Sequence, residues 1–177
     1  MKNNKIKILI PLLIVAVIAG MWFFKQQQEA EQIEADSQLT ESLADENFAL
    51  TATSIDLDVL SEYGLPIMID FGADSCVPCK EMAPVLVTLN AEMQEKAIVK
   101  FVDVWKNPEA ATDFPVQVIP TQIIINADGT PYVPSENMDI EFIMYATQDT
   151  EEHVYTAHQG GLTEEQMRAI LADMGVE

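Results

Sequence analysis

The chain has 177 residues, which is enough for one domain of ordinary size with some additional segments. Its 29 Asp and Glu residues outnumber its nine Lys and Arg residues, and the formal net charge of −20 argues against a nucleic acid partner. The charge is unevenly placed, because the basic residues of the first 25 positions are followed by a strongly acidic body.

Residues 8–24 form an apolar run without a charged side chain, preceded by three lysines and closed by Lys25. At about 1.5 Å per residue a helix over this run reaches about 25 Å, close to the thickness of a bilayer's hydrocarbon core. A cleaved signal peptide is the alternative, with Ala19 at a small-residue cleavage site. We expect residues 1–25 to be an uncleaved transmembrane signal anchor with its N-terminus in the cytoplasm, since basic residues stay on that side.

Residues 26–47 are rich in Gln, Glu and Ala and contain few large aliphatic side chains. Such a composition cannot bury a core, so we expect an acidic linker, with an ordered N-terminal helix as the alternative. The remaining residues, 48–177, would then form a domain on the extracytoplasmic side of the cytoplasmic membrane, held there by a single membrane pass. Disulfides persist in that compartment.

The domain is expected to begin with alternating strands and helices. Apolar runs predict strands at residues 48–53, 66–73, 98–104 and 122–125. Helices are predicted at residues 56–63, capped by Ser54 or Asp56, at residues 80–95, from Asn107 onward, and at residues 163–174 with a capping box of Thr163 and Gln166. A turn at residues 126–129 should lead into an antiparallel partner. The pattern predicts an α/β fold with one mixed sheet and helices on both faces.

The two cysteines of the chain, Cys76 and Cys79, lie where the strand at 66–73 gives way to a helix. A thiol at a helix N-terminus faces unpaired N–H groups and the positive end of the helix dipole, which lower its pKa from about 8.5 to about 3.5–7.5. Two sulfurs on one helical turn can form and reopen a disulfide. A zinc site usually needs four ligands, and an inert disulfide with so short a loop would stabilise little, so redox chemistry is favoured over both alternatives.

This motif resembles the active-site sequence of the thioredoxin family, and further family motifs follow in the same order. The residues that fall at family positions are Val77-Pro78, Lys80, Pro84, Asp70, Lys100, Ile119-Pro120-Thr121, Asp128-Gly129 and Gly160-Gly161-Leu162-Thr163. The resemblance covers residues 48–129 and 155–175. It implies a thioredoxin fold that uses no cofactor or metal beyond a redox-active disulfide between Cys76 and Cys79. Ser75 and Gly72 stand where the family often carries Trp, so we expect a more open and less aromatic groove beside Cys76.

The resemblance also implies roles for residues around the cysteines. Cys76, nearest the helix start, is expected to be the attacking thiolate, and Cys79 to resolve the mixed disulfide. Asp70 lies in an apolar strand, where desolvation should raise its pKa, and is expected to relay the Cys79 proton with Lys100 as its neighbour. The alternatives are a satisfied strand-end carboxylate and a plain surface lysine.

The substrate groove is expected on the other side of the cysteines. The resemblance implies a cis Pro120 that faces them, while the backbone of Ile119 offers hydrogen bonds to an extended substrate; the alternative for Pro120 is the start of an edge strand. Val77, Pro78 and Gly160 are expected to complete this groove.

Residues 131–154 exceed the tight hairpin that the family usually has before its last helix. Strands are predicted at residues 140–146 and 153–156, which indicates a lengthened hairpin insertion. His153 and His158 in this region could suggest a metal site, but isolated histidines on strands are more often structural.

The sequence therefore predicts a membrane-anchored, extracytoplasmic thiol–disulfide oxidoreductase that reduces disulfides in proteins. Pro78 favours this direction, because strongly oxidising relatives often carry a histidine before the second cysteine. The expected partners are protein disulfide substrates and a membrane-embedded dithiol that donates electrons. Two alternatives stay open, a disulfide-donating oxidase and a copper-handling protein that uses the cysteine pair with some of the nine methionines.

Overall fold

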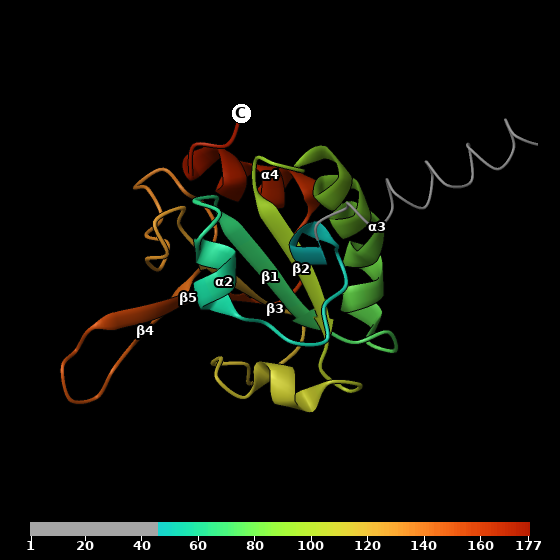
Figure 1. Ribbon diagram of the computed structural model, residues 1–177, viewed down its shortest axis with the longest axis horizontal. Coiled ribbons are helices and arrows are strands. Elements are labelled where there is room, and N and C mark those ends of the chain that lie inside the picture. The colour runs from blue at the N-terminus through green and yellow to red at the C-terminus, as the bar shows by residue number, and fades with distance from the viewer. Residues whose placement is uncertain (1–45) are drawn as a thin grey trace, which may run out of the picture. The chain divides into compact units, whose positions relative to one another are not determined.

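A mixed sheet of five strands, in the order β2-β1-β3-β5-β4, carries the helices on its two faces (Figure 1). The computed structural model describes residues 46–177. Its strands are β1 (Ile67–Gly72), β2 (Ile98–Asp103), β3 (Thr121–Ile125), β4 (Ile143–Ala146) and β5 (His153–Gln159). β1 and β2 are parallel, and the other neighbours are antiparallel. The predicted mixed sheet is confirmed.

Three α-helices and two short 3₁₀ turns accompany the sheet: α2 (Leu57–Ser61), α3 (Val77–Glu92), α4 (Glu164–Asp173), η1 (Glu46–Phe48) and η2 (Pro108–Ala111). Asp56, rather than Ser54, caps α2 by accepting a hydrogen bond from the Val59 N–H at 3.1 Å. The predicted capping box of Thr163 and Gln166 is present at the start of α4. Within the described residues no helix is long and apolar enough to cross a membrane. The predicted anchor at 1–25 and nearly all of the predicted linker lie outside this region.

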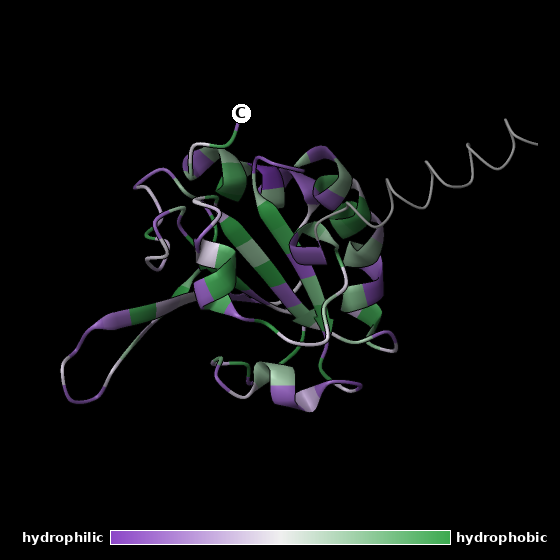
Figure 2. Cartoon of the chain, viewed as in Figure 1, coloured by the Kyte–Doolittle hydropathy of each residue, from purple (hydrophilic) through white to green (hydrophobic). Residues whose placement is uncertain are grey.

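β1 is buried along its whole length, because apolar side chains fill the space on both faces of the sheet. Met68 and its neighbours in β2 and β3 pack against α3 and α4. On the opposite face, Ile67, Ile69 and Phe71 pack with Leu60 of α2 and with η2. Figure 2 shows the hydrophobic colouring of β1 and β2 at the centre of the domain. Packing on both faces holds the C-terminal end of β1 in place, and the cysteine motif begins there.

Two predicted elements near the edges are shorter than expected. The strand predicted at residues 48–53 is a single parallel bridge between Thr51 and Phe101, because η1 precedes it and a bend at residues 53–54 follows it. The helix predicted from Asn107 is the single 3₁₀ turn η2. Pro115 follows shortly after this turn, and a proline disfavours helical geometry in the residue before it.

The region between β3 and α4 pairs differently from the prediction. The turn is present, with the Gly129 N–H donating to the Asn126 carbonyl at 2.9 Å, but the antiparallel partner directly after it is one bridge between Ile125 and Pro131. Pro131 has no N–H to donate to a ladder. β5 instead pairs with β3, and β4 lies on the outer side of β5. The β4–β5 hairpin projects away from the helices (Figure 1).

Candidate functional site

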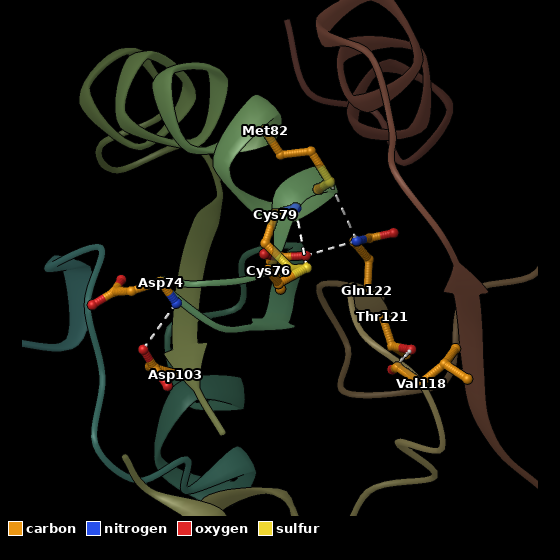
Figure 3. Close-up of a disulfide and its surroundings, with 9 residues drawn as sticks. Asp74, Cys76, Cys79, Met82, Asp103, Val118, Thr121 and Gln122 are labelled. Atoms are coloured by element: carbon orange, nitrogen blue, oxygen red, sulfur yellow. Dashed lines mark hydrogen bonds between the residues drawn. A yellow bond between two sulfur atoms is a disulfide. The ribbon is translucent and has the colours of Figure 1, made fainter. Parts of the chain in front are cut away.

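Cys76 and Cys79 form a disulfide at the N-terminus of α3, with their Cα atoms 5.3 Å apart (Figure 3). Cys76 is the N-cap residue, and its sulfur accepts a hydrogen bond from the Cys79 N–H at 3.3 Å. The relative exposure is 9% for Cys76 and 3% for Cys79. The expected position at the junction of strand and helix is confirmed, and Cys79 is the more covered of the two sulfur-bearing residues.

The loop before Cys76 is held by Asp103 at the end of β2. Asp103 accepts hydrogen bonds from the Asp74 N–H at 3.1 Å and from the Trp105 and Lys106 N–H groups at 3.0 and 3.1 Å. Burial opposes the ionisation of this carboxyl, but these backbone donors and the nearby Lys106 ammonium lower its pKa overall. Lys106 also forms an ion pair with Asp74. Sequence analysis did not single out Asp103; the only signal was an acidic residue that ends an apolar strand.

Asp70 is fully buried on β1, on the face of the sheet that α3 covers. Burial raises its pKa from 3.8 to about 6, although a hydrogen bond from Gln122 opposes the rise. The Gln122 Nε2 donates to Asp70 Oδ1 at 2.6 Å. The predicted direction of the pKa is confirmed. Gln122 was placed in a strand by sequence analysis but was not recognised as a partner of Asp70.

The second oxygen of Asp70 and the sulfur of Cys79 border the same point in space, next to Gly72. A Cβ built on Gly72 would lie 3.3 Å from Asp70 Oδ2 and 3.2 Å from Cys79 Sγ. The carboxyl and the more buried sulfur are therefore close neighbours in the core. This proximity is the arrangement that a proton transfer between them requires.

Lys100 does not lie beside Asp70, so this part of the sequence prediction is wrong. In the register of β1 and β2, Lys100 is opposite Ile69, and Phe101 is opposite Asp70. Because successive side chains of a strand point to opposite faces, Lys100 belongs to the face away from Asp70. Its Nζ donates to the carbonyl oxygens of Glu46 and Ala49 at 3.0 and 2.7 Å. Lys100 thus fastens the segment around η1 to β2.

The space beside Gly72 is filled by an aromatic ring, while the more open groove predicted beside Cys76 stays a prediction. A Cβ on Gly72 would lie 3.0 Å from Cε2 of Phe101, so the Phe101 ring fills the space that a side chain at position 72 would otherwise enter. A cavity of about 240 Å³ remains further out, lined by Cys79, Leu86 and Phe101 among others. The site keeps an aromatic ring, but the ring comes from β2.

The structure brings most of the predicted groove residues to the cysteines. The Ile119–Pro120 peptide bond is cis, and Ile119 packs against Ala73, Cys76 and Cys79. The Gly160 N–H donates to the Pro120 carbonyl at 2.9 Å. Pro78 lies near the next glycine, at 4.0 Å from a Cβ built on Gly161, and Val77 and Val118 are exposed.

The two histidines are engaged within the hairpin. The His153 Nε2 lies 2.8 Å from the Thr156 Oγ1, and the His158 Nδ1 lies 2.8 Å from the Glu141 carbonyl. In residues 46–177 no group of three His, Cys, Asp or Glu side chains could hold a metal ion. Met68, Met82 and Met167 are buried in the apolar core, where packing accounts for them.

Comparisons with known proteins agree with this geometry. The model of the thioredoxin family matches residues 46–141. Thioredoxin of Mycobacterium tuberculosis is 40% identical over 93 residues, which are 52% of this chain and 78% of that protein. Thioredoxin of Staphylococcus aureus is 39% identical over 92 residues, 49% of this chain and 86% of that one. The crystal structure of chloroplastic thioredoxin z is similar in fold, with a TM-score of 0.50 and 20% identity, and the match covers 72% of this chain and 94% of that chain.

Proposed function

The chain belongs to the thioredoxin family, and on this premise we propose that it reduces protein disulfides on the outer side of the cytoplasmic membrane. It is a thiol–disulfide oxidoreductase, as its relatives and its Cys76–Cys79 pair indicate. What we propose beyond this is the direction of electron flow, the protein substrates, the membrane anchor and the compartment.

One observation carries the chemistry: the Cys79 N–H points at the Cys76 sulfur at the first turn of α3. In the reduced protein this donor would face a thiolate, and a charge-assisted hydrogen bond together with the helix dipole stabilises that thiolate. Cys76 is therefore the group that reacts first. Cys79 lies deeper and is suited to the second step.

The reaction then proceeds by two exchanges. The Cys76 thiolate attacks one sulfur of a substrate disulfide, that bond breaks, and the other substrate sulfur leaves as a thiolate. The Cys79 thiol next gives its proton to the Asp70 carboxylate and attacks the Cys76 sulfur. The Cys76–Cys79 bond forms, the second substrate sulfur leaves, and two electrons have passed to the substrate.

The oxidised pair must be reduced again by two electrons, and we propose a membrane-embedded dithiol as their source. The apolar run at residues 8–24 would hold the domain near such a donor and raise the effective concentration of each for the other. Pro78, in place of a histidine, supports a potential nearer the thioredoxin value of about −270 mV than the DsbA value of about −120 mV.

The test is turnover with a reductant and with the cell's own donor. The full chain in detergent, supplied with dithiothreitol, should reduce the interchain disulfides of insulin, and Cys76→Ser should not. Acid-quenched thiol trapping in growing cells should find the pair mostly reduced. A mostly oxidised pair with the donor system intact would identify a disulfide donor instead.

A further inference from the structure

Two fully buried polar side chains face each other in the middle of the sheet, Asp70 on β1 and Gln122 on β3. They are directly opposite in the antiparallel register, and both have a relative exposure of 0%. Their surroundings are apolar, with Met68, Met82 and Ile124 in the same core cluster. Burying an amide in such a place is costly unless its polar atoms are paired. A methionine or leucine at position 122 would avoid this cost.

The pair is only partly satisfied. Within residues 46–177, Asp70 Oδ2 and Gln122 Oε1 are the buried side-chain oxygen or nitrogen atoms that have no hydrogen-bond partner. Figure 3 shows the amide nitrogen of Gln122 directed towards α3 and its oxygen turned away from the disulfide. A site built only for stability would rarely keep two unpaired buried acceptors. This arrangement therefore points to a use for the amide.

The hydrogen bond fixes how the carboxylate is oriented. Gln122 Nε2 holds Oδ1 at 2.6 Å, and this contact leaves Oδ2 as the oxygen beside the point that Cys79 Sγ also borders. A carboxylate held at one oxygen cannot rotate freely. The oxygen that would receive the Cys79 proton is thus presented in a constant direction.

An amide also suits both protonation states of Asp70. As a carboxylate, Asp70 accepts the Nε2 hydrogen bond seen in the structure. As a carboxylic acid protonated on Oδ2, Asp70 can keep the same hydrogen bond, because its carbonyl oxygen Oδ1 still accepts from Nε2. An apolar side chain of the same size could serve neither state. Gln122 can therefore keep its position in both protonation states of Asp70.

We propose that Gln122 is a positioning residue for the proton transfer from Cys79 to Asp70, which it serves by holding Oδ1 and presenting Oδ2. The proposal rests on the function proposed above. In the step that it supports, the Cys79 S–H bond breaks, its proton goes to Asp70 Oδ2, and the freed sulfur electron pair forms the bond to Cys76. The bond between Cys76 and the substrate sulfur breaks, and that sulfur leaves as a thiolate. Gln122 acts through Asp70 and contacts no substrate.

In any pH-dependent test, the effects of other groups around Asp70 must be distinguished from the effect of Gln122. Phe101 faces Asp70 from β2, Met82 approaches the Gln122 amide from α3, and Cys79 is the titratable neighbour on that helix. His158 on β5 lies directly opposite Gln122. An Asp70→Asn background removes the carboxyl and leaves the thiol and the imidazole in place, so it separates these contributions.

The first measurement is the titration of the Asp70 carboxyl carbon by ¹³C NMR in the full chain. Gln122→Met keeps the side chain's size and removes its donor, so the midpoint should rise by about one pH unit, a tenfold change in the acid constant. Gln122→Asn, whose amide is too short to reach, should shift it the same way and serves if the methionine variant folds poorly. Gln159→Met is the matched control, because Gln159 pairs with Thr121 and so belongs to the other face of the sheet.

The second measurement isolates the step itself. The reduced full chain reacts with 5,5′-dithiobis(2-nitrobenzoate) in two releases of chromophore: Cys76 attack gives the first, and Cys79 attack gives the second. In Gln122→Met the second release should slow at pH 8, where Asp70 is ionised in both proteins, because Oδ2 is no longer held in one direction. At pH 5 it should slow about tenfold more, because the supply of Asp70 carboxylate has also fallen. In the Asp70→Asn background the same substitution should change neither rate.

An unmoved carboxyl midpoint would overturn the proposal, and so would a second release that keeps its rate at pH 8 or slows equally at pH 5 and pH 8. Failure of the proposed function would look different. If the unmodified chain reduced no insulin, the reductase proposal would fall, and the carboxyl titration alone would then decide whether Gln122 holds Asp70.

Discussion

Replacing Asp70 by Asn should make the folded protein more stable at neutral pH. Asp70 is fully buried, and burial raises its pKa from 3.8 to about 6. Between these two values the folded state binds the proton more tightly than the unfolded state does. The contribution of Asp70 to the free energy of unfolding is therefore highest below about pH 3.8, falls as the pH rises towards about 6, and stays at the lower level above it.

The size of this loss follows from the displacement of the pKa. Each pKa unit corresponds to about 1.4 kcal/mol, so a rise of about two units costs at most about 3 kcal/mol at pH 7. The asparagine side chain of the Asp70→Asn variant would carry no charge at any pH, and its oxygen could still accept the hydrogen bond from Gln122. We therefore expect Asp70→Asn to gain up to about 3 kcal/mol at pH 7.5 and almost nothing at pH 3.5.

Equilibrium urea unfolding of the oxidised chain at both pH values measures this difference, provided the m-values agree. Asp103→Asn is the matched control, because backbone donors lower the pKa of Asp103 and its ionised form supports the fold. That variant should lose stability at pH 7.5, and the loss should shrink as the pH falls through the range where Asp103 titrates. An Asp70→Asn variant that is less stable at pH 7.5, or equally stabilised at both pH values, would refute the reasoning.

Four further predictions concern the cysteines, the packing beside them and the anchor. Reduced Cys76 should alkylate near neutral pH, with an apparent pKa below about 8.5, and Cys79 much more slowly; equal rates in mass-spectrometric footprinting would remove the distinction between nucleophile and resolver. Gly72→Ala should lower the free energy of unfolding by about 1–3 kcal/mol, because its Cβ would lie 3.0 Å from the Phe101 ring. Gly161→Ala, whose Cβ would meet nothing closer than 3.9 Å, should cost much less in the same denaturant assay. A periplasmic-type reporter fused after the last residue should be active, and activity only of a cytoplasmic reporter would overturn the predicted orientation.

The elements that sequence analysis predicted well depend on interactions between residues close in the chain. The capping box of Thr163 and Gln166 joins residues three apart, and Cys76 caps α3 through the N–H of Cys79. Such signals are complete within one helical turn. The strand pairing near Pro131 depended on a distant segment, β5, and no local pattern indicates which of two strands will take the place beside β3.

The placement of Lys100 failed for a related reason. Apolar residues occupy both faces of β2, so the run at residues 98–104 contains no alternation that would fix which side chains face α3. A slip of one residue moves every side chain to the opposite face. Phe101, and not Lys100, is opposite Asp70 as a result. Only the register with β1 could have settled this point.

That register has a consequence for the chemistry of Asp70. With Phe101 opposite Asp70 and the Lys100 ammonium bound to carbonyl groups on the other face, the groups closest to the carboxyl are an aromatic ring, an amide and a sulfur. Nothing in this set offsets burial as a cation would, so the pKa rises towards the range where a thiol can exchange its proton with a carboxylate. The same lack of compensation makes the folded state less stable at neutral pH. Ionised Asp70 therefore lowers the free energy of unfolding, and the reaction uses this same ionisation. This is expected where a buried group is retained for its chemistry and not for its contribution to folding.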